Sequence, residues 1–169
     1  GLTEVVQVPE GCALPTAITS QDYSTQGNPF GWASVSQIIS QSLIASSVAT
    51  ASGTAVAING LTATFYIPSG YKARVTLTGD SFENNTNNAY SVLQLWDGAV
   101  VSGTAIARSL ARYPVGNTPV PFYCEATINQ SGVTKTINAS FNTLGGGTMT
   151  VNASVTYPLT MTVELLAGL

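Results

Sequence analysis

The sequence predicts an all-β protein, an antiparallel sandwich or barrel of about eight or nine strands. Apolar and polar residues alternate with a period of two through most of the chain, and turn signals recur at short intervals. No long segment combines helical spacing with good helix formers. A chain of 169 residues is long enough for one domain with a substantial core.

The carboxyl-terminal strands are the clearest. Apolar residues occupy the odd positions from Met149 to Leu165, and Pro158 is the one interruption. This pattern predicts two strands, joined or bent at Tyr157-Pro158, each with one buried and one solvated face. Asn59-Gly60 lies between two alternating runs and predicts a two-residue hairpin, because a type I′ turn needs positive φ at both positions.

The remaining strands are delimited by turn residues. The predicted strands cover residues 71–78, 90–96, 104–111, 120–129 and 133–141. Pro68-Ser69-Gly70, Asp97-Gly98 and Gln130-Ser131-Gly132 separate them. Residues 35–48 have helix-like spacing but are rich in Ser, so we expect a strand or extended chain with at most a short helical turn.

The first 33 residues are rich in Pro and Gly and are expected to form an extended arm ahead of a domain at residues 34–169. Val5, Val6 and Val8 are expected to add a strand to a neighbouring subunit. No run approaches 18 apolar residues, so we expect no membrane contact. Gly1-Leu2-Thr3-Glu4 is neither basic nor apolar, so no signal peptide is expected.

The charge content is very low. Charged residues make up 8% of the chain, and five Lys and Arg face eight Asp and Glu, which leaves a net charge of −3 and no basic face for nucleic acid. No His is present, which excludes histidine nucleophile systems and histidine zinc sites. Ser, Thr and Asn supply 50 residues. These either serve simply as strand and turn residues or form neutral faces that pack against other subunits.

Few residues suggest chemistry, so we predict no enzyme, no catalytic residue, no cofactor and no metal. Asp80 and Glu83 form the closest acidic pair, but residues 79–88 have the composition of a solvated loop. Cys124 shares an alternating face with Phe122, which favours a small buried hydrophobe over a disulfide.

Two aromatic and two basic residues remain as candidate contacts. Trp32 and Trp96 are candidates for stacking on a glycan or a protein partner, although core packing is the commoner role. Arg108 and Arg112 share one strand face, so they either pair with acidic groups across an interface or are solvated.

Two segments resemble a known family. Residues 91–98 (SVLQLWDG) with 103–107 (GTAIA), and residues 147–153 (GTMTVNA) with the closing residues 157–168, are similar to small β-sandwich domains of bacteriophage structural proteins. Such domains resemble the tumour-necrosis-factor-like jelly roll and serve as trimeric fibre knobs or as capsid decoration and cement proteins. The resemblance covers residues 54–169 and implies no catalytic residues.

The resemblance implies a structural virion protein, assembled in the host cytoplasm. The expected form is a homotrimeric decoration or cement protein that contacts the major capsid protein or another virion protein. Two alternatives are a receptor- or glycan-binding tail-fibre knob or lectin-like module, and a pilus or surface-layer subunit.

Overall fold

The computed structural model describes residues 37–167, which form eleven β-strands and contain no helix. The strands are β1 (Gln37–Ile44), β2 (Val48–Thr50), β3 (Val56–Ile67), β4 (Tyr71–Thr78), β5 (Ser81–Asn84), β6 (Tyr90–Asp97), β7 (Thr104–Arg112), β8 (Tyr123–Ile128), β9 (Val133–Leu144), β10 (Met149–Asn152) and β11 (Leu159–Ala167). The chain divides into residues 1–33 and 34–169, and the strands belong to the second unit. No helix suited to crossing a membrane occurs in the described range.

The strands form two four-stranded antiparallel sheets and one of three strands. The larger sheets have the orders β1-β11-β4-β8 and β3-β9-β6-β7. Within these sheets β1 pairs with β11, β3 with β9, β4 with β8, and β6 with β7. The two halves of the domain therefore pair as one long antiparallel ribbon wound into a sandwich, which is a jelly roll. This confirms the predicted all-β, jelly-roll-like fold.

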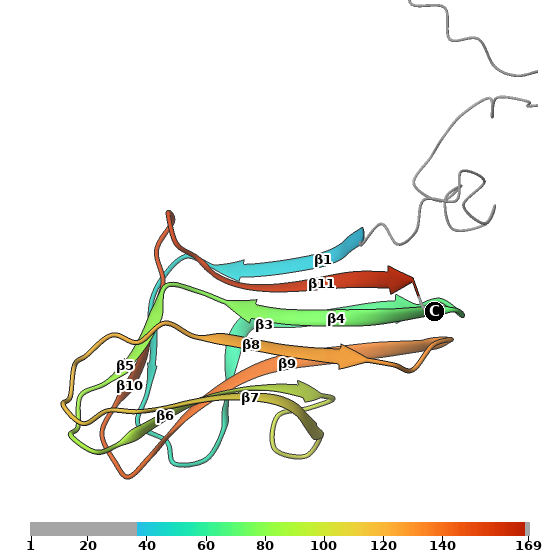
Figure 1. The fold of residues 1–169 in the computed structure, drawn as a ribbon. Coiled ribbons are helices and arrows are strands. Elements are labelled where there is room, and N and C mark those ends of the chain that lie inside the picture. Colours follow the sequence, from blue (N-terminus) through green and yellow to red (C-terminus); the bar gives the residue numbers. More distant parts are fainter. Residues whose placement is uncertain (1–36, 168–169) are drawn as a thin grey trace, which may run out of the picture. The chain divides into compact units, whose positions relative to one another are not determined.

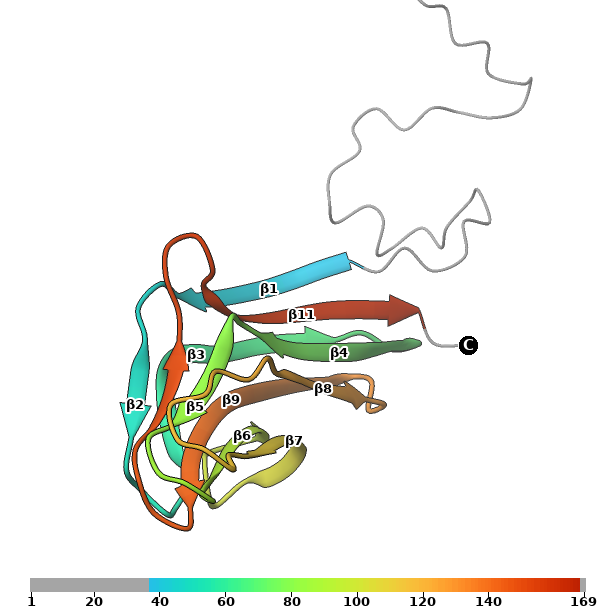
Figure 2. The ribbon, with the colours of Figure 1, turned by 60° about the vertical axis from the view of Figure 1, so that its left-hand side comes forward.

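The three-stranded sheet β2-β10-β5 closes one end of the sandwich. In Figures 1 and 2 these strands stand nearly upright at the left, across the direction of the strands in the four-stranded sheets. Each lies in the chain between strands of different sheets: β2 between β1 and β3, β5 between β4 and β6, and β10 between β9 and β11. The sequence predicted β10 as part of a longer strand before Pro158, and it missed β2 and β5 as separate strands.

The core lies between the two larger sheets. Leu77 and Cys124 from one sheet and Leu93 and Ile137 from the other are among its fully buried side chains. At the closed end the Phe82 ring makes edge-to-face contacts with Tyr113 and Phe122, with ring centroids 6.2 and 5.3 Å apart. Truncating an aromatic core residue of this kind typically costs about 3–5 kcal/mol.

The predicted hairpin at Asn59-Gly60 is wrong. Strand β3 continues through these residues and pairs with β9 on both sides of them, with a register shift between Ala57 and Thr62. Gly60 has the expected positive φ of 88°, but Asn59 does not share it. One left-handed residue produces a bulge, whereas a type I′ turn needs two.

Two further predictions need correction. Residues 79–88 are not all loop, since Ser81–Asn84 form β5 and Phe82 is buried. Gln130-Ser131-Gly132 does turn the chain, but it connects β8 to β9 in the opposite sheet, so it is an arch between sheets. The predicted strand at 120–129 begins at Tyr123, and Val120 forms only an isolated bridge to Phe82.

Several local predictions are confirmed. Residues 37–44 form strand β1, and Asp97-Gly98 begins the turn between the paired strands β6 and β7. Pro68 and Gly70 close the turn before β4, where the Tyr71 N–H donates to the Pro68 carbonyl over 3.1 Å. Cys124 is a free, buried thiol, and burial raises its pKa to about 11.

Candidate interaction surfaces

A tract of threonines covers the outer face of the β1-β11-β4-β8 sheet, and we call it the threonine face. The core residues of β4 and β11 alternate with outward threonines, and the register sets Thr76 against Thr162 and Thr78 against Thr160. Thr127 on β8 extends the tract. The face therefore presents methyl and hydroxyl groups at regular cross-strand spacing. It also carries Lys72, Arg74, Glu125 and Glu164, whose formal charges sum to zero.

Two of the four charged residues on this face form an ion pair with each other. The Arg74 guanidinium donates to the Glu164 carboxylate, and this hydrogen bond raises the pKa of Arg74. The Tyr123 hydroxyl donates to Glu125, which raises the pKa of Tyr123. Partners approaching this face meet groups whose charges are already partly compensated.

Large apolar side chains flank the threonines. Leu43 on β1 is 53% exposed and Tyr123 on β8 is 57% exposed. Beyond the sheet, the turn between β10 and β11 carries Val155, at 87% exposure, and Tyr157, at 63%. The Ser154 N–H donates to the Tyr157 carbonyl over 3.0 Å, and the Ser154 hydroxyl accepts the Tyr157 N–H over 3.1 Å. This closed turn holds both side chains out into solvent.

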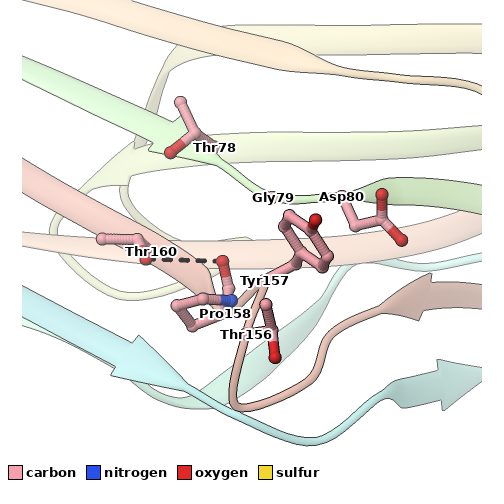
Figure 3. A pocket seen from close by; sticks show the side chains of 7 residues that line it. All are labelled: Thr78, Gly79, Asp80, Thr156, Tyr157, Pro158 and Thr160. Carbon is pink, nitrogen blue, oxygen red and sulfur yellow. Dashed lines mark hydrogen bonds between the residues drawn. The ribbon is translucent and has the colours of Figure 1, made fainter.

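A shallow pocket of about 250 Å³ lies where the threonine face meets this turn (Figure 3). Thr78 and Thr160 belong to both, and the Thr160 hydroxyl donates to the Pro158 carbonyl over 3.4 Å. Asp80 is the one charged residue in its wall, and Tyr157 supplies the aromatic ring. The pocket therefore continues the threonine face with hydroxyl, aromatic and proline groups and one carboxylate.

The opposite sheet has a different outer face. On its edge strand β7, Arg108 and Arg112 are exposed on the same side as Leu110, which is 50% exposed. The Arg112 guanidinium lies 5.9 Å from the centre of the Tyr90 ring and donates to the Asn88 side chain over 3.1 Å. These contacts hold a positive charge over an aromatic ring at the sheet edge.

Trp96 lies on β6 in this same sheet and is half-buried. Its indole N–H donates to the Ser140 hydroxyl over 2.7 Å. Its polar group is therefore satisfied within the domain, and contact with a glycan or protein would use the exposed part of the ring. Trp32, Val5, Val6 and Val8 lie outside the described residues.

Sequence patterns missed part of these surfaces. Thr76-Leu77-Thr78 and Thr160-Met161-Thr162 repeat the same Thr-x-Thr pattern, which is the signal that could have indicated a threonine face. Only the strand register places the two repeats side by side. Nothing in the local sequence distinguishes Val155 from a buried strand residue, because it continues the alternation of β10. In residues 37–167, no three His, Cys, Asp or Glu side chains gather as a metal site.

Comparison with known proteins identifies no family for this chain. No family model and no curated protein matches the chain. A solved structure of Eiger TNF from S. frugiperda aligns with it at a TM-score of 0.37 and 7% identity, over 75% of this chain and 90% of that one. The assignment to the jelly-roll β-sandwich class rests on the strand pairing described above.

Proposed function

We propose that this chain is a structural protein of a bacteriophage particle, a head decoration or cement protein that assembles as a homotrimer and stabilises the capsid. The observation that carries this proposal is the threonine face with its exposed Leu43, Tyr123 and Tyr157. A face with no net charge and with apolar groups at its margin can be covered by another subunit, and its Arg74–Glu164 pair already compensates two of its four charges.

The contacts would be of two kinds. Sandwich faces pack around a closed symmetry axis, and the amino-terminal arm reaches a neighbouring subunit or the major capsid protein. In this proposal the protein is not an enzyme, takes no cofactor, and acts on the virion surface after assembly in the host cytoplasm. The sequence resemblance to phage β-sandwich domains supports the choice of particle.

Sedimentation equilibrium of the purified chain tests the trimer. At micromolar concentration we expect a species of about 52 kDa, three times the 17.4 kDa chain. The variant Leu43→Glu/Tyr123→Glu introduces charge on the threonine face and should shift the equilibrium towards monomer. The matched variant Gln130→Glu/Ser131→Glu changes exposed turn residues by the same charge and should leave it unchanged.

Incubation with capsids tests whether the chain binds the phage head. Purified virions should contain the chain in a fixed ratio to the major capsid protein, and the added chain should cosediment with capsids stripped of it. A chain that stays monomeric and is absent from virions would contradict the proposal.

A further inference from the structure

Strand β7 is the one positively charged edge of the sandwich. The two four-stranded sheets end in β1, β8, β3 and β7. Strands β1 and β3 contain no charged residue and β8 contains only Glu125, whereas β7 contains Arg108, Arg112 and no acid. An acidic strand would therefore be attracted to β7 in preference to the other three edges.

Neither arginine on β7 has an acidic partner in residues 37–167. The two ion pairs found there join Arg74 to Glu164 and Lys135 to Asp97. Between Arg108 and Arg112 lies the half-exposed Leu110. The outward face of this edge thus presents a basic, an apolar and a second basic side chain in succession, over about 13 Å of strand.

The complementary charge precedes the sandwich in the sequence. Residues 37–167 contain all five Lys and Arg of the chain and five of its eight Asp and Glu, so they are neutral overall. The other three acids are Glu4, Glu10 and Asp22, so the entire net charge of −3 belongs to the preceding residues. Two of these acids, Glu4 and Glu10, lie on either side of Val5, Val6 and Val8 in the segment Thr3–Glu10.

The spacing within this segment suits a strand. In an extended chain Glu4, Val6, Val8 and Glu10 share one face, because side chains alternate with a period of two. That face is acidic at both ends and apolar between them. It therefore has the opposite charge and a similar apolar centre to the face that Arg108, Leu110 and Arg112 present. The acids are six residues apart and the arginines four, so one acid can lie directly opposite an arginine and the other diagonal to one.

We propose that Thr3–Glu10 of a neighbouring copy adds as an antiparallel strand to β7, on the edge that has no hydrogen-bonded neighbour strand within residues 37–167. Placing Glu4 opposite Arg112 puts Val6 opposite Leu110 and Val8 opposite Arg108. Glu10 is then on the diagonal from Arg108, within reach of a long side chain. This inference rests on the proposed self-assembly, and it identifies β7 as the strand that the amino-terminal arm of a neighbouring copy contacts. Pro9 has no N–H to offer a further strand, so the added strand is a poor template for continued growth.

Charge reversal in the full chain tests the contact. One variant carries Glu4→Lys/Glu10→Lys and the other carries Arg108→Glu/Arg112→Glu. Each alone sets like charges against each other and should weaken self-association by about ten-fold or more in sedimentation velocity. In an equimolar mixture the lysine arms meet glutamate edges and the native arms meet native edges. A closed ring of three then has two restored contacts and one like-charge contact, so association should return in part.

Milder variants control for folding and net charge. Arg108→Gln/Arg112→Gln changes the charge by the same amount as Gln130→Glu/Ser131→Glu, and only the first should weaken association. Circular dichroism melting of every variant verifies that the sandwich is folded.

Two outcomes would overturn the arm contact. Unchanged association of the reversed variants shows that the charges are not in contact. Stronger association of Arg108→Gln/Arg112→Gln shows that the arginines keep copies apart instead, as charges on edge strands can do. If the wild-type chain itself is monomeric, the proposed trimer fails first, so the two failures are distinguishable.

Discussion

Gly147 is the position with the least room for a side chain in the turn before β10. Its φ is +77°, and a Cβ placed there would lie 2.3 Å from the Thr86 hydroxyl, 2.4 Å from the Asn84 amide oxygen and 2.7 Å from that of Asn85. Asn84 is fully buried and donates to the Thr143 hydroxyl over 2.7 Å, so it cannot easily yield.

Replacing Gly147 with Ala is expected to lower the free energy of unfolding by about 3 kcal/mol, from left-handed strain and overlap together. Gly146→Ala is the matched control, since φ there is +93° but nothing lies within 4 Å of the added Cβ. It should cost about 1 kcal/mol from strain alone. Urea denaturation measures both, and equal losses would contradict the steric account.

The buried Tyr113 hydroxyl and Cys124 thiol make the stability of the domain sensitive to high pH. Burial raises the pKa of Tyr113 to about 12 and that of Cys124 to about 11. Because both pKa values are higher in the folded protein, the associated stability is complete below pH 9 and is lost as the pH rises from 9 to 12. Melting temperatures should fall over this range, less steeply in Tyr113→Phe and Cys124→Ala than in the wild type. Parallel curves would contradict the assignment.

At the scale of elements, β1 carries an uncompensated polar group. Its Ser42 hydroxyl is buried without a hydrogen-bond partner in the described structure. Ser42→Ala is therefore expected to raise the free energy of unfolding by about 0.5–1 kcal/mol. Ser91→Ala serves as the contrast, because the buried Ser91 hydroxyl donates to the Glu83 carbonyl over 3.3 Å. It should be destabilising in the same denaturant titration.

Individual strands were largely predictable and their connections were not. Alternation and turn residues together located β4, β6, β7, β9 and β11. The alternation is plainest in β4 and β11, because each buries one face and exposes the other. The Asn59-Gly60 bulge and the arch at Gln130 carry the same local signals as hairpins. Which strand lies beside each turn is decided by distant pairing partners. The candidate surfaces share this limit, since the threonine face exists only once β4 and β11 are in register.

At the scale of the whole domain, charge is distributed unequally along the chain. The sandwich described by residues 37–167 has equal numbers of acidic and basic residues, and the preceding residues hold the surplus of acids. Composition alone gave a low charge for the whole chain and did not separate these two parts. A neutral sandwich has weak long-range repulsion from its own copies, which suits a subunit that works in close contact with them.

The pairing of β1 with β11 also bears on synthesis. Ile44 pairs with Leu159, about 115 residues later in the chain. At roughly 5–20 residues per second, a ribosome needs about 6–23 s to supply the partner after β1 has been made. During this interval β1 lacks its hydrogen-bonding neighbour, and a β11 segment from another nascent copy is an equivalent partner. Folding of this domain therefore competes with strand exchange between copies until translation is complete.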